Sequence, residues 1–98
     1  LSNFNTSKVT YMNNMFNGCS SLTSLNLSNF DTSSVINIHD MFNGCVNLEY
    51  INLNNFDEKA LSDSQSNYIN MFYNISKNVV ICIEKSITQS KIFPQIEN

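Results

Sequence analysis

The sequence predicts an α/β fold, a solenoid of stacked repeats with short parallel strands on one face and short helices on the other. Three observations predict it: a repeated block, an alternating apolar pattern, and a capped apolar stripe at helical spacing. Residues 27–45 closely copy residues 1–19 at an offset of about 26 residues. A fixed period of this size is typical of stacked supersecondary units rather than of one irregular core.

The strand of each unit is predicted by alternation. Residues 22–27 and 48–53 both read L-x-x-(L/I)-x-L, and their last three positions alternate apolar and polar side chains. This alternation indicates a short strand that is buried on one face. Successive strands would pair in parallel as one sheet.

The helix of each unit is predicted by its start, stripe and stop. Residues 31–33 are good helix N-cap residues. Gly44 stands where a helix C-cap favours a residue that tolerates positive φ. Between them, apolar residues recur on one face of a helix of two to three turns: Val35, Ile38, Met41 and Phe42.

The predicted domain organisation is a repeat fragment of about three coils over residues 1–85, followed by a short capping helix or tail over residues 86–98. The third copy keeps Phe56 but reaches Met71 late, which indicates an insertion of about four residues within 57–70. In the tail we expect a helix over residues 87–93 that is broken by Pro94. Ile92 or Phe93 would pack over the open end of the last coil.

The repeated pattern resembles a known family. L-x-x-L-x-L is the core of the leucine-rich repeat, and the longer L-S-N-F-D-T-S-x-V-x-N-(M/I)-x-x-M-F-x-G-C-x-x-L is similar to the BspA-like leucine-rich repeats of bacterial and protist surface proteins. The resemblance is strong over residues 1–56 and weak over 67–84. It implies a cell-surface or secreted protein that recognises a host or matrix protein, with adhesion as its role. In the third copy Asn74 and Ile75 replace Gly-Cys, which puts that helix cap in doubt.

The candidate binding surface is the concave face of the predicted sheet. If Leu25 and Leu27 point inward, the residues between them point outward, and solenoids use such a face for partners. Tyr50 offers the rigid amphipathic contact area that interfaces favour. The alternative is that these positions are solvated and have no partner. The candidate ligand-binding residues are Ser24, Asn26, Ser28, Tyr50, Asn52 and Asn54.

Four kinds of residue allow a chemical and a structural interpretation. Cys19 and Cys45 recur at one repeat position. They could form a disulfide or a metal pair, but we expect buried thiols. Cys82 falls on an outward strand position. His39 is interpreted as a solvated helix residue rather than a base or ligand, and Asp31 and Asp57 as helix caps. The in-register aromatic side chains form an internal spine or a stacking row for sugars or bases, and we expect the spine: Phe4, Phe30 and Phe56.

Composition limits the function classes. The chain has 98 residues and a net charge of −3, so we expect one domain and no nucleic-acid partner, which would require a basic patch. No motif for catalysis, metal or cofactor binding occurs, and no segment is long enough to span a membrane. We therefore predict no enzyme. The alternatives to a binding module are a structural spacer with no ligand of its own and, more distantly, a regulatory segment of an enzyme.

The chain begins inside a repeat without an initiator Met. We therefore expect it to be a fragment of a longer protein. An uncapped end of a repeat array exposes apolar edges, which would favour self-association.

Overall fold

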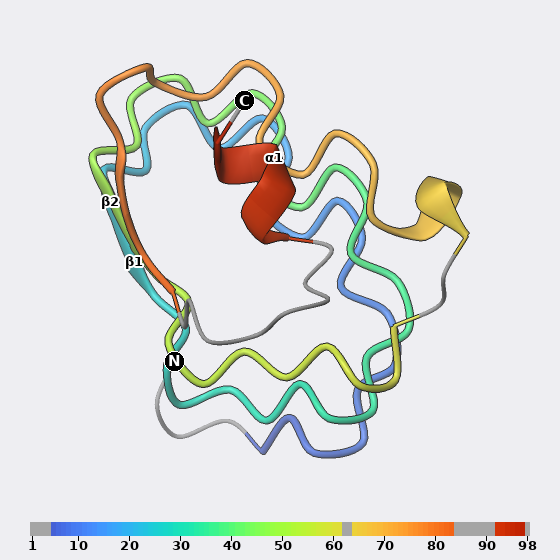
Figure 1. Cartoon of the computed structure of the whole chain (residues 1–98). Helices are drawn as coiled ribbons and strands as arrows, with labels where there is room; N and C mark the ends of the chain where they lie inside the picture. Colours follow the sequence, from blue (N-terminus) through green and yellow to red (C-terminus); the bar gives the residue numbers. More distant parts are fainter. Residues whose placement is uncertain (1–4, 62–63, 84–91, 98) are drawn as a thin grey trace.

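A computed structural model of the chain describes residues 5–61, 64–83 and 92–97 (Figure 1). In chain order its elements are strand β1 (Ser24–Asn26), strand β2 (Tyr50–Asn52), the 3-10 helix η1 (Gln65–Asn67), strand β3 (Val80–Cys82) and helix α1 (Phe93–Glu97). The strands form one parallel sheet in the order β1-β2-β3. Each strand comes from one of the three sequence copies, so the copies lie side by side.

The register of the sheet follows the sequence repeat. Ser24 pairs with Tyr50, 26 residues further on, and Tyr50 pairs with Val80, 30 residues further on. The change of spacing arises outside the strands. The Thr32 side chain bonds to Asp57, 25 residues away, whereas Ile38 N donates to the carbonyl of Asn67, 29 residues away. Four extra residues of the third copy therefore lie between Asp57 and Asn67, in the segment that contains η1.

The helices predicted after the N-cap clusters are absent. Residues 32–45 form successive turns, closed by hydrogen bonds from residue i+3 back to residue i, as from Met41 N to Ile38 O at 3.2 Å. Alternate amides instead donate to the next copy, as from Phe42 N to Met71 O at 3.0 Å. An α-helix uses its amides internally and cannot form such a ladder. The left-handed φ of +56° at Asp40 also ends any helical run.

The predicted fold class is therefore wrong. The residues that the structure describes form a small compact globule built on a three-stranded parallel sheet, with almost no helix and no evident solenoid among them. Its radius of gyration is 12.4 Å and its extents are 31 × 29 × 24 Å. Helical spacing of apolar residues misled the prediction because a chain of turns can also bury every third or fourth side chain. Val35, Ile38 and Met41 are all fully buried without a helix.

Threonine hydroxyls tie neighbouring copies together inside the molecule. Thr6 Oγ1 accepts a hydrogen bond from Asp31 N at 2.7 Å and donates one to Asp31 O at 3.3 Å. Thr32 makes the same pair of bonds to Asp57, at 2.6 and 3.1 Å. Both threonines are buried. These hydroxyls therefore satisfy backbone groups that burial would otherwise leave unpaired.

The core consists of apolar positions that recur in each copy. Phe30 and Phe56 are buried, as the internal-spine interpretation predicted, while Phe4 lies outside the described residues. A second aromatic row stacks through the core, with ring centroids 5.8 Å apart for Phe16 and Phe42 and 5.6 Å apart for Phe42 and Phe72. This offset stacking adds to the free energy gained from apolar burial.

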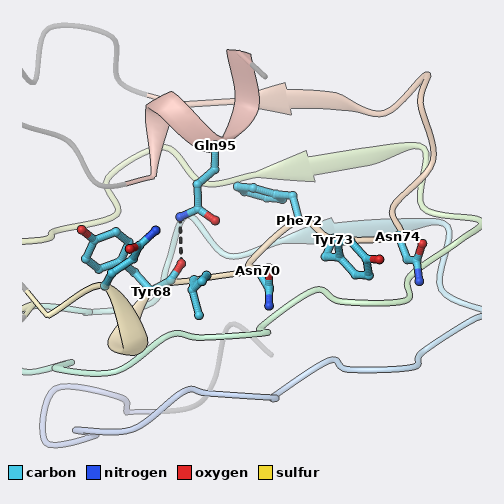
Figure 2. A pocket seen from close by; sticks show the side chains of 8 residues that line it. Tyr68, Asn70, Phe72, Tyr73, Asn74 and Gln95 are labelled. Atoms are coloured by element: carbon cyan, nitrogen blue, oxygen red, sulfur yellow. Dashed lines mark hydrogen bonds between the residues drawn. The ribbon is translucent and has the colours of Figure 1, made fainter.

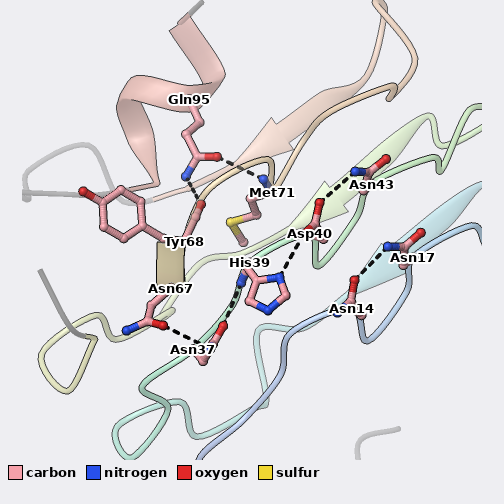
Figure 3. Close-up of polar contacts among 10 residues, drawn as sticks. All are labelled: Asn14, Asn17, Asn37, His39, Asp40, Asn43, Asn67, Tyr68, Met71 and Gln95. Atoms are coloured by element: carbon pink, nitrogen blue, oxygen red, sulfur yellow. Dashed lines mark hydrogen bonds and ion pairs between the residues drawn. The ribbon is translucent and has the colours of Figure 1, made fainter. Parts of the chain in front are cut away.

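Helix α1 covers the third copy, although it lies later in the chain than predicted. Residues 87–91 of the predicted helix lie outside the described residues; α1 begins at Phe93 and includes Pro94 in its first turn, where proline is tolerated. Ile92 is fully buried, as expected of a residue that packs on the last copy. Gln95 Nε2 donates to Tyr68 O at 2.9 Å, and Met71 N donates to Gln95 Oε1 at 3.1 Å (Figure 3). In the other copies this turn is closed by a direct backbone hydrogen bond, as from Met41 N to Ile38 O. In the third copy the Gln95 carboxamide bridges the corresponding two backbone groups.

Candidate binding surface

The outward residues of the three strands include four of the six residues that the sequence predicted for binding: Ser24, Asn26, Tyr50 and Asn52. In β1 and β2 the middle residue is buried and the flanking residues are exposed or half-buried, and in β3 the flanking residues are exposed. The strand register aligns these flanking residues in two rows across the sheet. The described residues do not form an arched solenoid, so this surface is called the outward sheet face rather than a concave face. It consists of Ser24, Asn26, Tyr50, Asn52, Val80 and Cys82.

The apolar part of the outward sheet face is the pair Tyr50 and Val80. These residues are register partners on adjacent strands. Their exposed fractions are 36% for Tyr50 and 60% for Val80, and Ser24 continues their row on β1. Directly paired residues of neighbouring strands lie close enough for their side chains to touch. The face therefore carries a solvent-exposed apolar pair that extends from the central strand β2 to the edge strand β3.

The polar row of the outward sheet face ends the strands. Asn26 Oδ1 accepts hydrogen bonds from Ser28 N at 2.9 Å and from Ser28 Oγ at 2.7 Å. Asn52 Oδ1 accepts one from Asn54 N at 2.9 Å. These are Asx turns, in which the side chain replaces a backbone acceptor and turns the chain out of the sheet. The Asn26 and Asn52 oxygens therefore have a structural role, whereas no bond from their amide nitrogens to a described residue is found.

The predicted site residues after the strands are less well placed. Ser28 is half-buried and its hydroxyl is bonded to Asn26. Asn54 is exposed. Both lie beyond the strand pairs that define the register. The structure thus brings together Ser24, Asn26, Tyr50 and Asn52, and places Ser28 and Asn54 at the edge of this group.

The aspartates predicted as helix caps have another role. Asp31 Oδ1 accepts from Ser33 N at 3.0 Å, and Asp57 Oδ1 accepts from Lys59 N at 2.9 Å. Each bond forms an Asx turn, and in the described part of the chain no α-helix begins directly after either residue, since the one α-helix there is α1 at Phe93–Glu97. The helix-cap interpretation is therefore wrong, although both side chains do bond a nearby backbone amide. Hydrogen bonds from Ser33 hold the pKa of Asp31 below its usual value.

The only histidine lies in the turns opposite the sheet. His39 is partly exposed and its Nδ1 lies 2.9 Å from Asp40 Oδ2 (Figure 3). Asp40 Oδ1 also accepts from Asn43 Nδ2 at 2.8 Å. The bonds from Asn43 and then His39 hold the pKa of Asp40 below its usual value. His39 is thus a turn residue and not the helix residue that we predicted.

The three cysteines are free thiols. Cys45 is buried and Cys19 half-buried, in line with the buried-thiol interpretation. Burial, with a smaller contribution from Cys19, raises the pKa of the Cys45 thiol, and its Sγ donates to Phe16 O at 3.0 Å. A protonated, bonded thiol is a poor nucleophile. Cys82 is exposed on β3, at the outward position that the alignment predicted.

Two groups of polar residues were not identified from the sequence. Thr32 belongs to the predicted N-cap cluster of residues 31–33, and Thr6 occupies the same repeat position, so their recurrence could have indicated a buried ladder. Tyr73 stands where the other copies have Asn17 and Asn43. This substitution was the available signal for the hollow beside α1 that is described below.

Two general features concern the described part of the chain. It contains no group of three or more His, Cys, Asp or Glu side chains arranged to hold a metal ion. Its helices are too short to cross a bilayer.

Comparison with known proteins gives the class of this chain. Residues 1–89 match the family described as Mycoplasma protein of unknown function, DUF285. The chain belongs to this family, a family of repeat proteins. No curated protein and no solved structure matches the chain.

Proposed function

We propose that this chain is a protein-binding module of a cell-surface or secreted protein, and that its outward sheet face recognises a host or matrix protein during adhesion. The observation that carries the proposal is the solvent-exposed Tyr50 on the central strand β2, with the exposed Val80 beside it on the edge strand β3. Interfaces are enriched in aromatic side chains at their centre and carry polar groups around it. Ser24, Asn26 and Asn52 supply such polar groups beside the pair.

The position at the cell surface is supported by the repeat motif. The segment from Leu27 to Cys45 is similar to the BspA-like repeats of surface proteins. Membership of a repeat family is compatible with a surface repeat protein. The low charge of the chain, −3 in 98 residues, favours a protein ligand over a polyanion, because a polyanion would require a basic patch.

The alternative is a spacer that positions another domain and has no ligand of its own. The Asx turns favour this alternative, because the side-chain oxygens of Asn26 and Asn52 are already occupied by Ser28 and Asn54. Self-association through the ends of the molecule stays a further prediction, which the sedimentation velocity of the isolated chain would test.

A binding panel distinguishes the two functions. The purified chain is titrated against immobilised collagen, laminin, fibronectin and epithelial cell-surface proteins by biolayer interferometry. The test variant is Tyr50→Ala with Asn52→Ala. The control is Tyr11→Ala with Asn13→Ala, which changes a tyrosine away from the sheet that is more exposed than Tyr50, 63% against 36%. The proposal predicts saturable binding that the control retains and the test variant loses. Binding by neither the wild type nor the control, with all three proteins folded, would favour the spacer.

A further inference from the structure

A hollow with a volume of about 420 Å³ lies between the turns of the third copy, η1 and α1. This volume is within the range of roughly 300–1,000 Å³ that small-molecule sites occupy. Its lining combines aromatic rings with carboxamides (Figure 2): Tyr68, Asn70, Phe72, Tyr73, Asn74 and Gln95. The hollow is on another part of the molecule than the outward sheet face and does not depend on the function proposed for that face.

The Asn70 carboxamide lacks a partner that the other copies provide. Asn14 Oδ1 accepts from Asn17 Nδ2 at 2.8 Å, and Asp40 Oδ1 accepts from Asn43 Nδ2 at 2.8 Å (Figure 3). Asn70 has the same left-handed backbone as these two residues, with φ of +59° against +60° and +56°. Its side chain therefore leaves the turn in the same direction.

Tyr73 occupies the position of the missing partner. It follows Asn70 by three residues, as Asn17 follows Asn14. A tyrosine has no carboxamide to return the bond. Tyr73 is instead 59% exposed and stands beside Asn70 in Figure 2. Among the described residues, the substitution thus exchanges an internal hydrogen bond for a carboxamide without that side-chain partner and a solvent-exposed tyrosine at the same place.

The rest of the lining is neutral and is held in place. Phe72 stacks on Phe42, and the Gln95 carboxamide is fixed by two bonds to the backbone of the Tyr68 turn. Asn74 has a φ of +56° where the other copies have glycine, so it adds a carboxamide that glycine cannot supply. The lining contains no Asp, Glu, Lys, Arg or His. An ionic ligand would lose its hydration here without gaining a counter-charge.

We propose that this hollow binds a neutral sugar. A carboxamide donates and accepts hydrogen bonds at once, which matches neighbouring hydroxyl groups on a sugar ring, and Asn70 and Asn74 supply two carboxamides. The Tyr73 ring covers the apolar C–H face of the sugar, since an aromatic side chain combines apolar area with a polar end. Phe72 and Gln95 form the preorganised wall against which the sugar is placed.

The test uses NMR titration of the whole ¹⁵N-labelled chain with maltose, lactose and N,N′-diacetylchitobiose, and with glucuronic acid as a charged control. The proposal predicts that at least one neutral sugar gives saturable shifts in residues 68–74 and in the Gln95 side-chain amide. Glucuronic acid should give none at the same concentration. If none of the three neutral sugars shifts these resonances, or if glucuronic acid shifts them equally, the proposal is wrong.

A matched variant separates binding from folding. Tyr73→Asn restores the residue of the other two copies, so it should fold and should return a bond to Asn70. We expect it to weaken sugar binding by about tenfold or more, the effect of losing one hydrogen bond and the stacking surface. Asn70→Ala should weaken binding similarly, and Asn14→Ala, at the equivalent position of the first copy, should not. Unchanged affinity in folded Tyr73→Asn would overturn the assignment.

Discussion

At the residue scale, a few side chains replace backbone hydrogen bonds and so determine where the chain turns. Thr6 and Thr32 bond the amide and carbonyl of the next copy, while Asn26 and Asn52 close the turns that end β1 and β2. In a chain with little regular secondary structure, these bonds satisfy polar groups that helices would otherwise satisfy internally.

The threonine bridge should contribute to stability. Thr32→Val keeps the shape of the side chain but leaves Asp57 N and O without the buried hydroxyl. We expect the free energy of unfolding to fall by about 1–3 kcal/mol, the usual cost of an unsatisfied buried polar group. Urea denaturation measures it, with Thr10→Val, at an exposed position, as the control. Equal stability of the two variants would show that the bridge contributes nothing.

The two glycines isolate the cost of a left-handed backbone. Gly18 and Gly44 have φ of +76° and +83°. A Cβ on Gly18 would meet nothing within 4 Å, and one on Gly44 would meet Gly18 atoms at 3.5 Å, an ordinary contact distance. Gly18→Ala and Gly44→Ala should therefore lose a similar amount of stability, about 1–2 kcal/mol each. A much larger loss in Gly44→Ala, measured by thermal and urea unfolding, would show that packing rather than φ requires glycine there.

Asp40 should make stability depend on pH. Its folded-state pKa lies below the unfolded value of 3.8, mainly because of the bond from Asn43. The carboxylate therefore stabilises the fold above pH 3.8, and this contribution is lost as the pH falls through the lower folded-state pKa. Asp40→Asn, which introduces the side chain found at positions 14 and 70, should reduce the loss of stability between about pH 4 and pH 2. Urea unfolding of both proteins between these pH values measures the difference. An equal loss of stability in the two proteins would show that Asp40 does not cause the pH dependence.

At the element scale, the sequence predicted the strands and their alignment but not the segments between them. Leu25 and Ile51 alternate with polar neighbours, and this local pattern determines which face of a strand is buried. The spacing of Val35, Ile38 and Met41 fits a helix and a chain of turns equally well, because both bury similar positions. The positive φ angles of Asn14 and Asp40 are incompatible with a continuous α-helix and so distinguish the chain of turns from the predicted helix.

The sequence predicted the outward positions of the sheet face but not the hollow beside α1. The outward positions of Tyr50 and Asn52 follow from alternation alone. The hollow beside α1 depends on Gln95 reaching Tyr68 across 27 residues. Such a contact has no local signal in the sequence, and only the substitution of Tyr73 in the repeat indicated a difference there.

Helix α1 should stabilise the third copy through one side chain. Gln95→Ala removes both bonds that close the turn from Tyr68 to Met71. We expect a loss of about 1–3 kcal/mol in the free energy of unfolding, since each bond contributes roughly 0.5–1.5 kcal/mol. Gln65→Ala, which changes an exposed glutamine of η1, is the control for urea unfolding. A Gln95→Ala variant as stable as this control would show that α1 does not hold the turn.

At the scale of the whole molecule, three copies of one motif form a single globule in which the central copy is the most buried. Phe42 of the central copy is fully buried, whereas Phe16 and Phe72, at the same repeat position in the first and third copies, are only partly buried. Ladders of backbone hydrogen bonds join the copies. They hold the three strands, of three residues each, together as one sheet face. The central claim is that the outward sheet face is where the protein ligand binds.

Hydroxyl-radical footprinting tests this claim most directly, because it reports the exposure of individual side chains. The chain is footprinted alone and at saturation with the matrix or cell-surface protein that binds it best in the panel. We predict that Tyr50 and Val80 become protected, while Tyr11 and Tyr73, which are also exposed when the chain is free, keep their reactivity. Undiminished oxidation of Tyr50 at saturation, with protection of Tyr11 or Tyr73 instead, would contradict it.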